Sequence, residues 1–146
     1  MNKHFLFQEG KWAGTGRATF SASSQVLPFT TSWVITGLGE ERYRAVQKVD
    51  IANQGVQTNV FTVTLHPSGD FDLFLENEVL GVFSGTGICD AEQLAWEFAH
   101  HGSLEGMESY KKTNEEEYSF CAEYVGADDL GATIHGTILK LKLPES

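Results

Sequence analysis

His100 and His101 form the most suggestive group for ligand chemistry in this sequence. Successive residues of a strand point to opposite sides, so only one of the two side chains can enter an interior. His100 shares its parity with Trp96 and Phe98, which places it on the apolar side of its segment. It is therefore a candidate for anchoring the polar group of a ligand or for ligating haem iron. His135, near the C-terminus, is a second candidate.

Neither metal binding nor catalysis has a recognisable motif. Metal clusters need three or four convergent ligands, and the sequence has no H-x-H, H-E-x-x-H or C-x-x-C pattern. The G-x-S-x-G elbow of hydrolases is absent as well. The possible acid–base residues His100, Glu97, Glu108 and Tyr118 are scattered along the chain. We therefore predict no metal site and assign no catalytic residue.

Two Gly-Thr-Gly stretches, at residues 14–16 and 85–87, raise the question of phosphate binding. Phosphate loops use backbone N–H groups at the start of a helix, and neither stretch is followed by a helical pattern. Glycine also relieves crowding where a strand bends tightly or another backbone comes close. The two stretches therefore indicate strand bending.

Composition and charge restrict the function further. A chain of 146 residues with 41% hydrophobic content can bury a substantial core, so residues 1–146 are predicted to form one domain. The net charge of −10 repels phosphate backbones, and we expect no nucleic-acid partner. No stretch resembles a signal-peptide core or a membrane span, so we expect a cytoplasmic protein without membrane insertion. The sequence leaves open whether the chain forms a homodimer.

Short strand-like segments separated by turn signals cover nearly the whole chain. They recur at the spacing of roughly 8 to 12 residues that is typical of antiparallel barrels and sandwiches. The ten segments are 11–22, 27–36, 42–51, 58–66, 71–76, 79–88, 93–101, 104–112, 117–125 and 132–143.

Alternation of side chains identifies one inward face for six segments, whereas the segments that begin at Val79, Leu104 and Ala132 have no clear parity. Sequential strands that each have one polar face fit a closed up-and-down barrel, because closure removes exposed edges. A two-sheet sandwich of the same strands has the same alternation. The inward residues are Trp12, Gly14, Gly16, Ala18 and Phe20; Tyr43, Ala45, Gln47, Val49 and Ile51; Phe61, Val63 and Leu65; Phe71, Leu73 and Leu75; Leu94, Trp96, Phe98 and His100; and Tyr118, Phe120, Ala122 and Tyr124.

The first predicted strand carries Gly10-Lys11-Trp12, followed by Gly14 and Gly16. A Gly-x-Trp at this place in an antiparallel meander resembles the calycin group, which includes lipocalins, fatty-acid-binding proteins, avidins and nitrobindin-like barrels. The resemblance implies a lipocalin-like barrel of about ten strands in which Trp12 closes one end. It also implies a small, mostly apolar ligand in the lumen. Gly14 and Gly16 are then expected to leave space above this tryptophan.

Three features depart from the best-known calycins. Lipocalins usually place an arginine on the last strand against the tryptophan, where this chain offers Lys140 and Lys142. A secretory signal is also missing, and no segment suggests the helix-turn-helix lid of fatty-acid-binding proteins. The pattern therefore looks more like the intracellular branches of the group than like a secreted lipocalin.

A ten-stranded barrel is wide enough that inward side chains need not fill it, so the inward aromatic and polar residues are candidate ligand contacts. We predict non-enzymatic binding of a small hydrophobic or planar molecule. The alternatives are a cofactor-free lyase or isomerase, a nitrobindin-like haem protein, an interaction module with an acidic outer face, and a barrel with a solid core. The predicted ligand-binding residues are Tyr43, Gln47, Asn59, Phe61, Trp96, Phe98, His100, Tyr118 and Tyr124.

Overall fold

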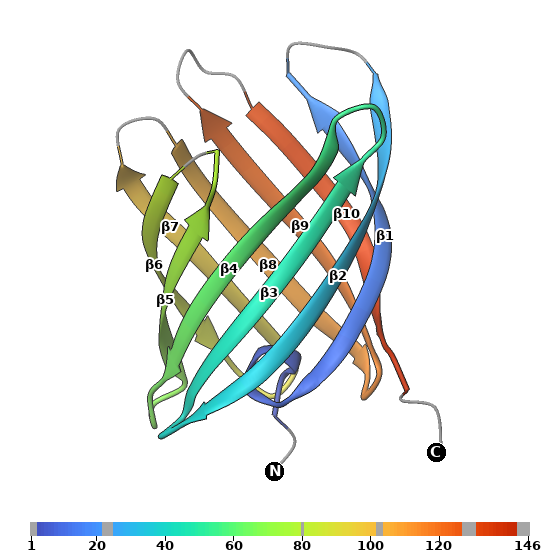
Figure 1. The fold of residues 1–146 in the computed structure, drawn as a ribbon. Coiled ribbons are helices and arrows are strands. Elements are labelled where there is room, and N and C mark those ends of the chain that lie inside the picture. Colours follow the sequence, from blue (N-terminus) through green and yellow to red (C-terminus); the bar gives the residue numbers. More distant parts are fainter. Residues whose placement is uncertain (1–2, 22–24, 80, 102–103, 127–130, 143–146) are drawn as a thin grey trace.

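The computed structural model describes residues 3–21, 25–79, 81–101, 104–126 and 131–142, with the side chains of residues 99–101 and 104 outside the description. Within these residues, ten antiparallel strands form a closed barrel (Figure 1). Every predicted segment corresponds to one strand. The strands are β1 (Gly10–Phe20), β2 (Val26–Gly39), β3 (Arg42–Ile51), β4 (Gly55–Leu65), β5 (Asp70–Asn77), β6 (Gly81–Cys89), β7 (Gln93–His101), β8 (Leu104–Asn114), β9 (Glu117–Gly126) and β10 (Gly131–Lys140).

Each strand pairs with its sequence neighbours, and β1 pairs with β10 to close the barrel. The closing ladder runs from Trp12 opposite Lys140 to Phe20 opposite Ala132. Closure gives every strand two hydrogen-bonded partners and leaves no open edge. The fold is therefore an all-β, lipocalin-like up-and-down barrel, and the sandwich alternative is wrong.

Burial confirms the predicted inward faces wherever side chains are described. In β3, for example, Tyr43, Ala45 and Gln47 are buried while Arg42 and Arg44 are exposed. None of the described residues belongs to a helix that could cross a membrane.

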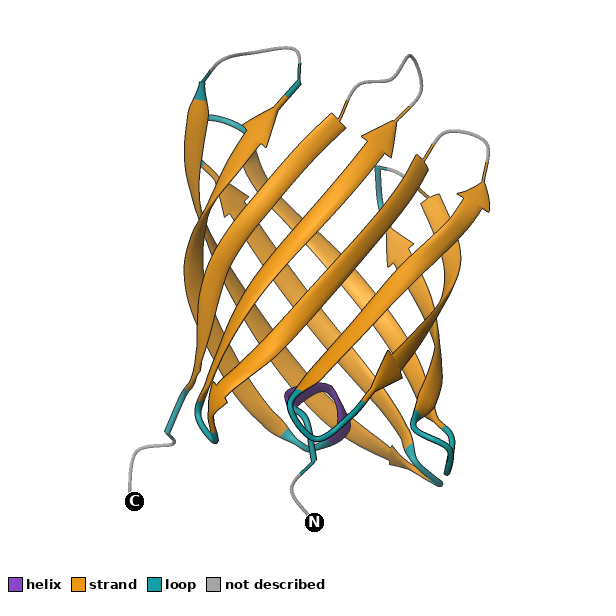
Figure 2. Ribbon diagram, turned by 180° about the vertical axis from the view of Figure 1, so that it is seen from behind, coloured by secondary structure: helices purple, strands orange, loops and turns teal. Residues whose placement is uncertain are grey.

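A short 3-10 helix, η1 (Phe5–Phe7), plugs one end of the barrel (Figure 2). All three of its residues are buried. The Phe5 ring lies 5.7 Å from the Trp12 ring and 5.2 Å from the Tyr118 ring. Aromatic pairs at these distances add to the stabilisation from area burial. Trp12 is fully buried at this end, against phenylalanine and tyrosine, whereas Lys140 is exposed.

Close packing fills the space beside Gly14 and Gly16 in β1. A Cβ atom on Gly14 would lie 2.8 Å from the Ile138 Cα atom and closer still to the Thr137 carbonyl oxygen. A Cβ atom on Gly16 would lie 2.6 Å from the Phe29 ring. These glycines let β1 approach β10 and let an aromatic ring lie on the strand, which agrees with strand bending.

A buried histidine ties the N-terminal segment to the barrel. The Phe5 N–H donates to the Tyr118 hydroxyl at 3.3 Å, and that hydroxyl lies 2.8 Å from His4 Nδ1. His4 Nε2 lies 2.6 Å from the Asp90 carbonyl oxygen. All three contacts are satisfied when the hydroxyl donates to Nδ1 and a neutral imidazole donates from Nε2. Burial lowers the pKa of His4, which favours this neutral form.

Substituting Gly14 with alanine should destabilise the barrel. The new methyl group meets backbone atoms of β10, which can move only if the closing ladder opens, and overpacking of this kind costs about 1–3 kcal/mol. Gly37→Ala is the matched control, because its Cβ would meet only the Glu9 side chain at 3.6 Å. Urea unfolding measures both variants. Equal unfolding free energies for the two would contradict the assigned role of Gly14.

Acidification should weaken the η1 plug through His4. Its folded pKa lies below the unfolded value of 6.5, so this contribution to stability is complete above that pH. It falls as the pH drops through 6.5 towards the folded pKa, by at most about 1.4 kcal/mol per pH unit. The difference in unfolding free energy between wild type and His4→Gln should therefore shrink between about pH 7 and about pH 5.

The buried carboxyl of Glu108 has a raised pKa, so its contribution to stability increases as the pH falls. Wild type and His4→Gln both contain Glu108, so this contribution cancels in the difference between their unfolding free energies. A difference that stays constant with pH would show that the protonation of His4 does not matter.

Candidate functional site

The half of the barrel away from η1 holds a cavity of about 270 Å³. Its lining residues lie at one end of the barrel, such as Phe20 at the end of β1, Ile51 at the end of β3 and Gly55 at the start of β4. At the rim, Gln54, Gly55 and Gln57 are exposed, so the cavity meets solvent there. The lining residues are Phe20, Phe29, Gln47, Val49, Ile51, Gln54, Gly55, Gln57, Asn59, Leu75, Asn77, Glu108, Phe120, Ala122, Tyr124, Ala132 and Ile134.

An aromatic stack separates the filled half from the hollow half. The Trp96 and Tyr110 rings stack at 5.1 Å, and the Tyr110 and Phe120 rings stack at 5.1 Å. Phe120 then meets the Phe29 ring edge-on at 6.1 Å, within the cavity lining. Below the stack, Trp33 is fully buried. The floor of the cavity is therefore rigid and aromatic.

Glu108 places a buried carboxyl group in the cavity wall. Its side chain is only 5% exposed. The Tyr110 hydroxyl donates to Glu108 Oε1 at 3.1 Å, and the Tyr124 hydroxyl donates to Oε2. Burial raises the pKa of Glu108, while the two tyrosine donors oppose that rise. Burial thus favours the neutral form of this carboxyl, and the hydrogen bonds to it favour the ionised form.

The backbone of β8 and β9 builds this cluster. Glu108 and Tyr110 are two residues apart on β8, so their side chains share the inner face. Gly106, on the same face, pairs with Tyr124, and a Cβ atom on Gly106 would collide with the Tyr124 ring. The missing side chain lets that ring lie across β8, which brings its hydroxyl to Glu108.

Uncharged amides line the wall formed by β2 to β5. Asn77 Nδ2 donates to Asn59 Oδ1 at 2.6 Å, and Asn59 Nδ2 donates to Gln47 Oε1 at 3.0 Å. Gln47 Nε2 donates to Thr31 Oγ1 at 3.2 Å. This chain of hydrogen bonds fixes the orientation of each amide and offers dipoles to a ligand without adding charge.

The predicted ligand contacts lie at different depths in the barrel. Gln47, Asn59 and Tyr124 line the cavity. Phe61 and Trp96 pack with Trp33 in the filled half, with ring centroids 5.4 Å and 6.5 Å from the Trp33 ring.

Four other predicted contacts lie away from this cavity or outside the description. Tyr43 packs 6.0 Å from Phe7, and Tyr118 bonds to His4, so both lie at the plugged end. Phe98 packs 6.3 Å from Phe83. The side chain of His100 lies outside the described residues, and the β7–β8 register is irregular between Phe98 and His101.

The prediction that His135 could ligate haem is wrong. Its side chain is exposed, and its strand partners Arg17 and Cys121 are exposed too, so it faces outward. Within the described lining there is no histidine, cysteine or methionine to ligate haem iron. No three His, Cys, Asp or Glu side chains of the described residues are grouped to hold a metal ion.

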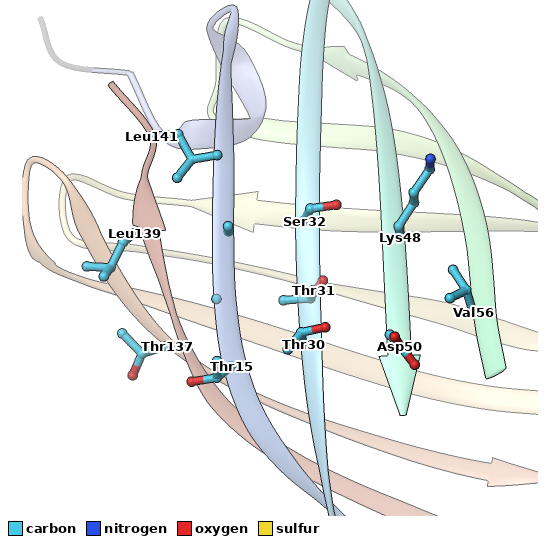
Figure 3. Close-up of a pocket in the computed structure, with 12 residues that line it drawn as sticks. Thr15, Thr30, Thr31, Ser32, Lys48, Asp50, Val56, Thr137, Leu139 and Leu141 are labelled. Atoms are coloured by element: carbon cyan, nitrogen blue, oxygen red, sulfur yellow. The ribbon is translucent and has the colours of Figure 1, made fainter. Parts of the chain in front are cut away.

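A second hollow lies on the outer surface, across β10, β1, β2, β3 and β4 (Figure 3). Thr15, Thr30 and Ser32 present short side chains there, with Lys48 and Asp50 at one side. This hollow lacks the converging aromatic and polar groups of the lumen, which makes the lumen the stronger candidate site.

Sequence comparison identifies no relative. No family model matches the chain, and no curated protein matches it.

Structure comparison finds similar barrels. The S-type phycobiliprotein lyase CPES from Guillardia theta has a TM-score of 0.71 and 10% identity, covering 93% of this chain and 89% of that one. Rv2717c from M. tuberculosis has a TM-score of 0.70 and 14% identity, covering 92% of each chain. EF1p2_mFAP2b, solved bound to DFHBI, has a TM-score of 0.54 and 12% identity, covering 93% of this chain and 94% of that one. At such identities the likeness establishes the lipocalin-like fold and nothing finer.

Proposed function

We propose that the protein binds a small, largely apolar or planar molecule in the lumen cavity without transforming it. The observation that carries the proposal is the half-filled interior: a cavity of about 270 Å³ bounded by Phe29, Phe120 and aliphatic side chains. Its volume is slightly below the usual range of about 300–1,000 Å³ for ligand pockets, which favours a compact ligand. Glu108, Gln47 and Asn59 supply the few polar groups that orient a ligand in such a pocket.

The structural neighbours offer limited support. A barrel of the same fold, EF1p2_mFAP2b, holds the small molecule DFHBI. CPES, a phycobiliprotein lyase, has the same fold. Neither fact identifies a ligand for this chain.

Calorimetric titration with para-tert-butylbenzyl alcohol tests the proposal, because this probe is compact, apolar and uncharged. We expect one molecule to bind per chain. Ala122 is buried in the cavity wall, so Ala122→Trp should fill the space and weaken binding at least about tenfold. Glu123→Trp places the same side chain at the neighbouring exposed position and should bind like wild type.

Ala132→Leu narrows the same cavity with a smaller change and is the second variant if Ala122→Trp does not fold. Absence of probe binding to the wild type, or equal binding by the folded cavity variants and the control, would refute a lumen site.

The Glu108 cluster favours proton transfer as a second candidate function. A buried carboxyl whose pKa is raised, next to the tyrosine hydroxyls of Tyr110 and Tyr124, has the chemistry of a general base. This is the environment that a cofactor-free lyase or isomerase would need.

Nitrobenzisoxazole tests this second candidate. Glu108 would take the proton from the ring carbon, and the N–O bond would break to give a coloured cyanonitrophenolate. We expect a rate above that of buffer which is lost in Glu108→Gln and kept in Glu97→Gln, a charge-matched change on the outer face. A rate that does not depend on Glu108 would exclude this role.

A further inference from the structure

The cavity carries acidic groups with no opposing basic group. Glu108 and Tyr124 are the ionisable residues of the described lining, which contains no lysine, arginine or histidine. A ligand carboxylate in this space would be buried near the Glu108 carboxyl, and no described residue of the lining would supply a cation to pair with it. Such a carboxylate and an ionised Glu108 would repel each other. The chain's overall charge of −10 disfavours anions as well.

Glu108 keeps the capacity to accept more hydrogen bonds. An ionised carboxylate has about four lone-pair sites. Tyr110 donates to one oxygen and Tyr124 to the other, and the indole N–H of Trp96 also interacts with this carboxyl. The remaining sites can accept an N–H donor that enters the cavity, and bonds between ionised groups are among the strong ones.

The surrounding groups are suited to a cation with an apolar body. The facing amides of Gln47 and Asn59 are neutral and already bonded to each other. Phe120 and Tyr124 present aromatic rings beside Glu108, and ring faces attract ammonium groups. Phe29, Val49 and Ile134 complete an apolar wall for the rest of the molecule.

We propose that the lumen selects hydrophobic amines, whose ammonium group pairs with Glu108, and rejects hydrophobic carboxylates of the same shape. This inference rests on the proposed lumen binding and adds the chemical class of the ligand. It sets the site apart from one built to hold a fatty acid.

Three probes with one apolar body test the inference: para-tert-butylbenzylamine, para-tert-butylbenzyl alcohol and para-tert-butylbenzoate. Calorimetric titration should show the amine binding at least about tenfold more tightly than the benzoate, with the alcohol between them. In Glu108→Gln the ratio of amine to benzoate affinity should fall towards one. Glu97→Gln removes the same charge from the outer face and should keep the preference.

Competition between the amine and the alcohol distinguishes binding in the lumen from nonspecific binding of amines to the acidic surface. Two molecules that bind in the same cavity displace each other. If the alcohol binds but the amine shows no advantage over the benzoate, the inference fails and lumen binding stands. The same holds if the advantage survives in Glu108→Gln. If none of the probes binds, the proposed function fails and the inference fails with it. Should Glu108→Gln not fold, the wild-type ratio of amine to benzoate affinity decides alone.

Discussion

The pairing of β1 with β10 is the constraint on which the rest of the structure depends. It joins the ends of a ten-strand meander and fixes the circumference of the barrel. In a barrel of this width, the inward side chains do not fill the whole interior. Gly14 lets the two backbones meet this closely. The lumen therefore exists because the ladder closes, and its shape depends on what fills each end.

The two ends of the lumen are occupied by different residues. At one end η1 adds Phe5 and Phe7 to an interior already occupied by Trp12 and Trp33, and His4 holds this segment in place. At the other end smaller residues such as Ala122 and Ala132 face the interior, and a cavity remains. Hydrogen bonds from Tyr110 and Tyr124 hold Glu108 beside this cavity, next to the aromatic stack.

The strand order and the inward faces could be predicted because alternation and turn residues are local signals. The depth at which a side chain lies along the barrel axis depends on the whole barrel and not on local sequence. Parity correctly placed Phe61 and Tyr118 inside, but it could not show that Phe61 lies in the filled layer and Tyr118 against η1. The three apolar residues of η1 are too few to show a period, so no pattern predicts that they enter the barrel.

The sequence offers Glu108 as a possible acid–base residue but does not place it in the lumen, for a different reason. In β8 it points inward, whereas its neighbour Met107 is 49% exposed, which reverses the usual relation between hydrophobicity and burial. A strand whose acidic residue is buried and whose methionine is exposed gives no usable alternation. The feature that indicates the inward position of Glu108 is the pairing of Gly106 with Tyr124. This pairing can be recognised only when the register of β8 with β9 is known.

The central claim is that the half of the lumen away from η1 is a ligand site organised by Glu108. A crystal structure of the protein grown with para-tert-butylbenzylamine tests it most directly. We predict that the probe ring lies in the cavity against Phe29 and Phe120 and that its nitrogen lies within hydrogen-bond distance of the Glu108 carboxylate. A probe seated in the outer hollow of Figure 3, or a lumen in which Phe120 and Tyr124 have moved to fill the cavity, would contradict the account.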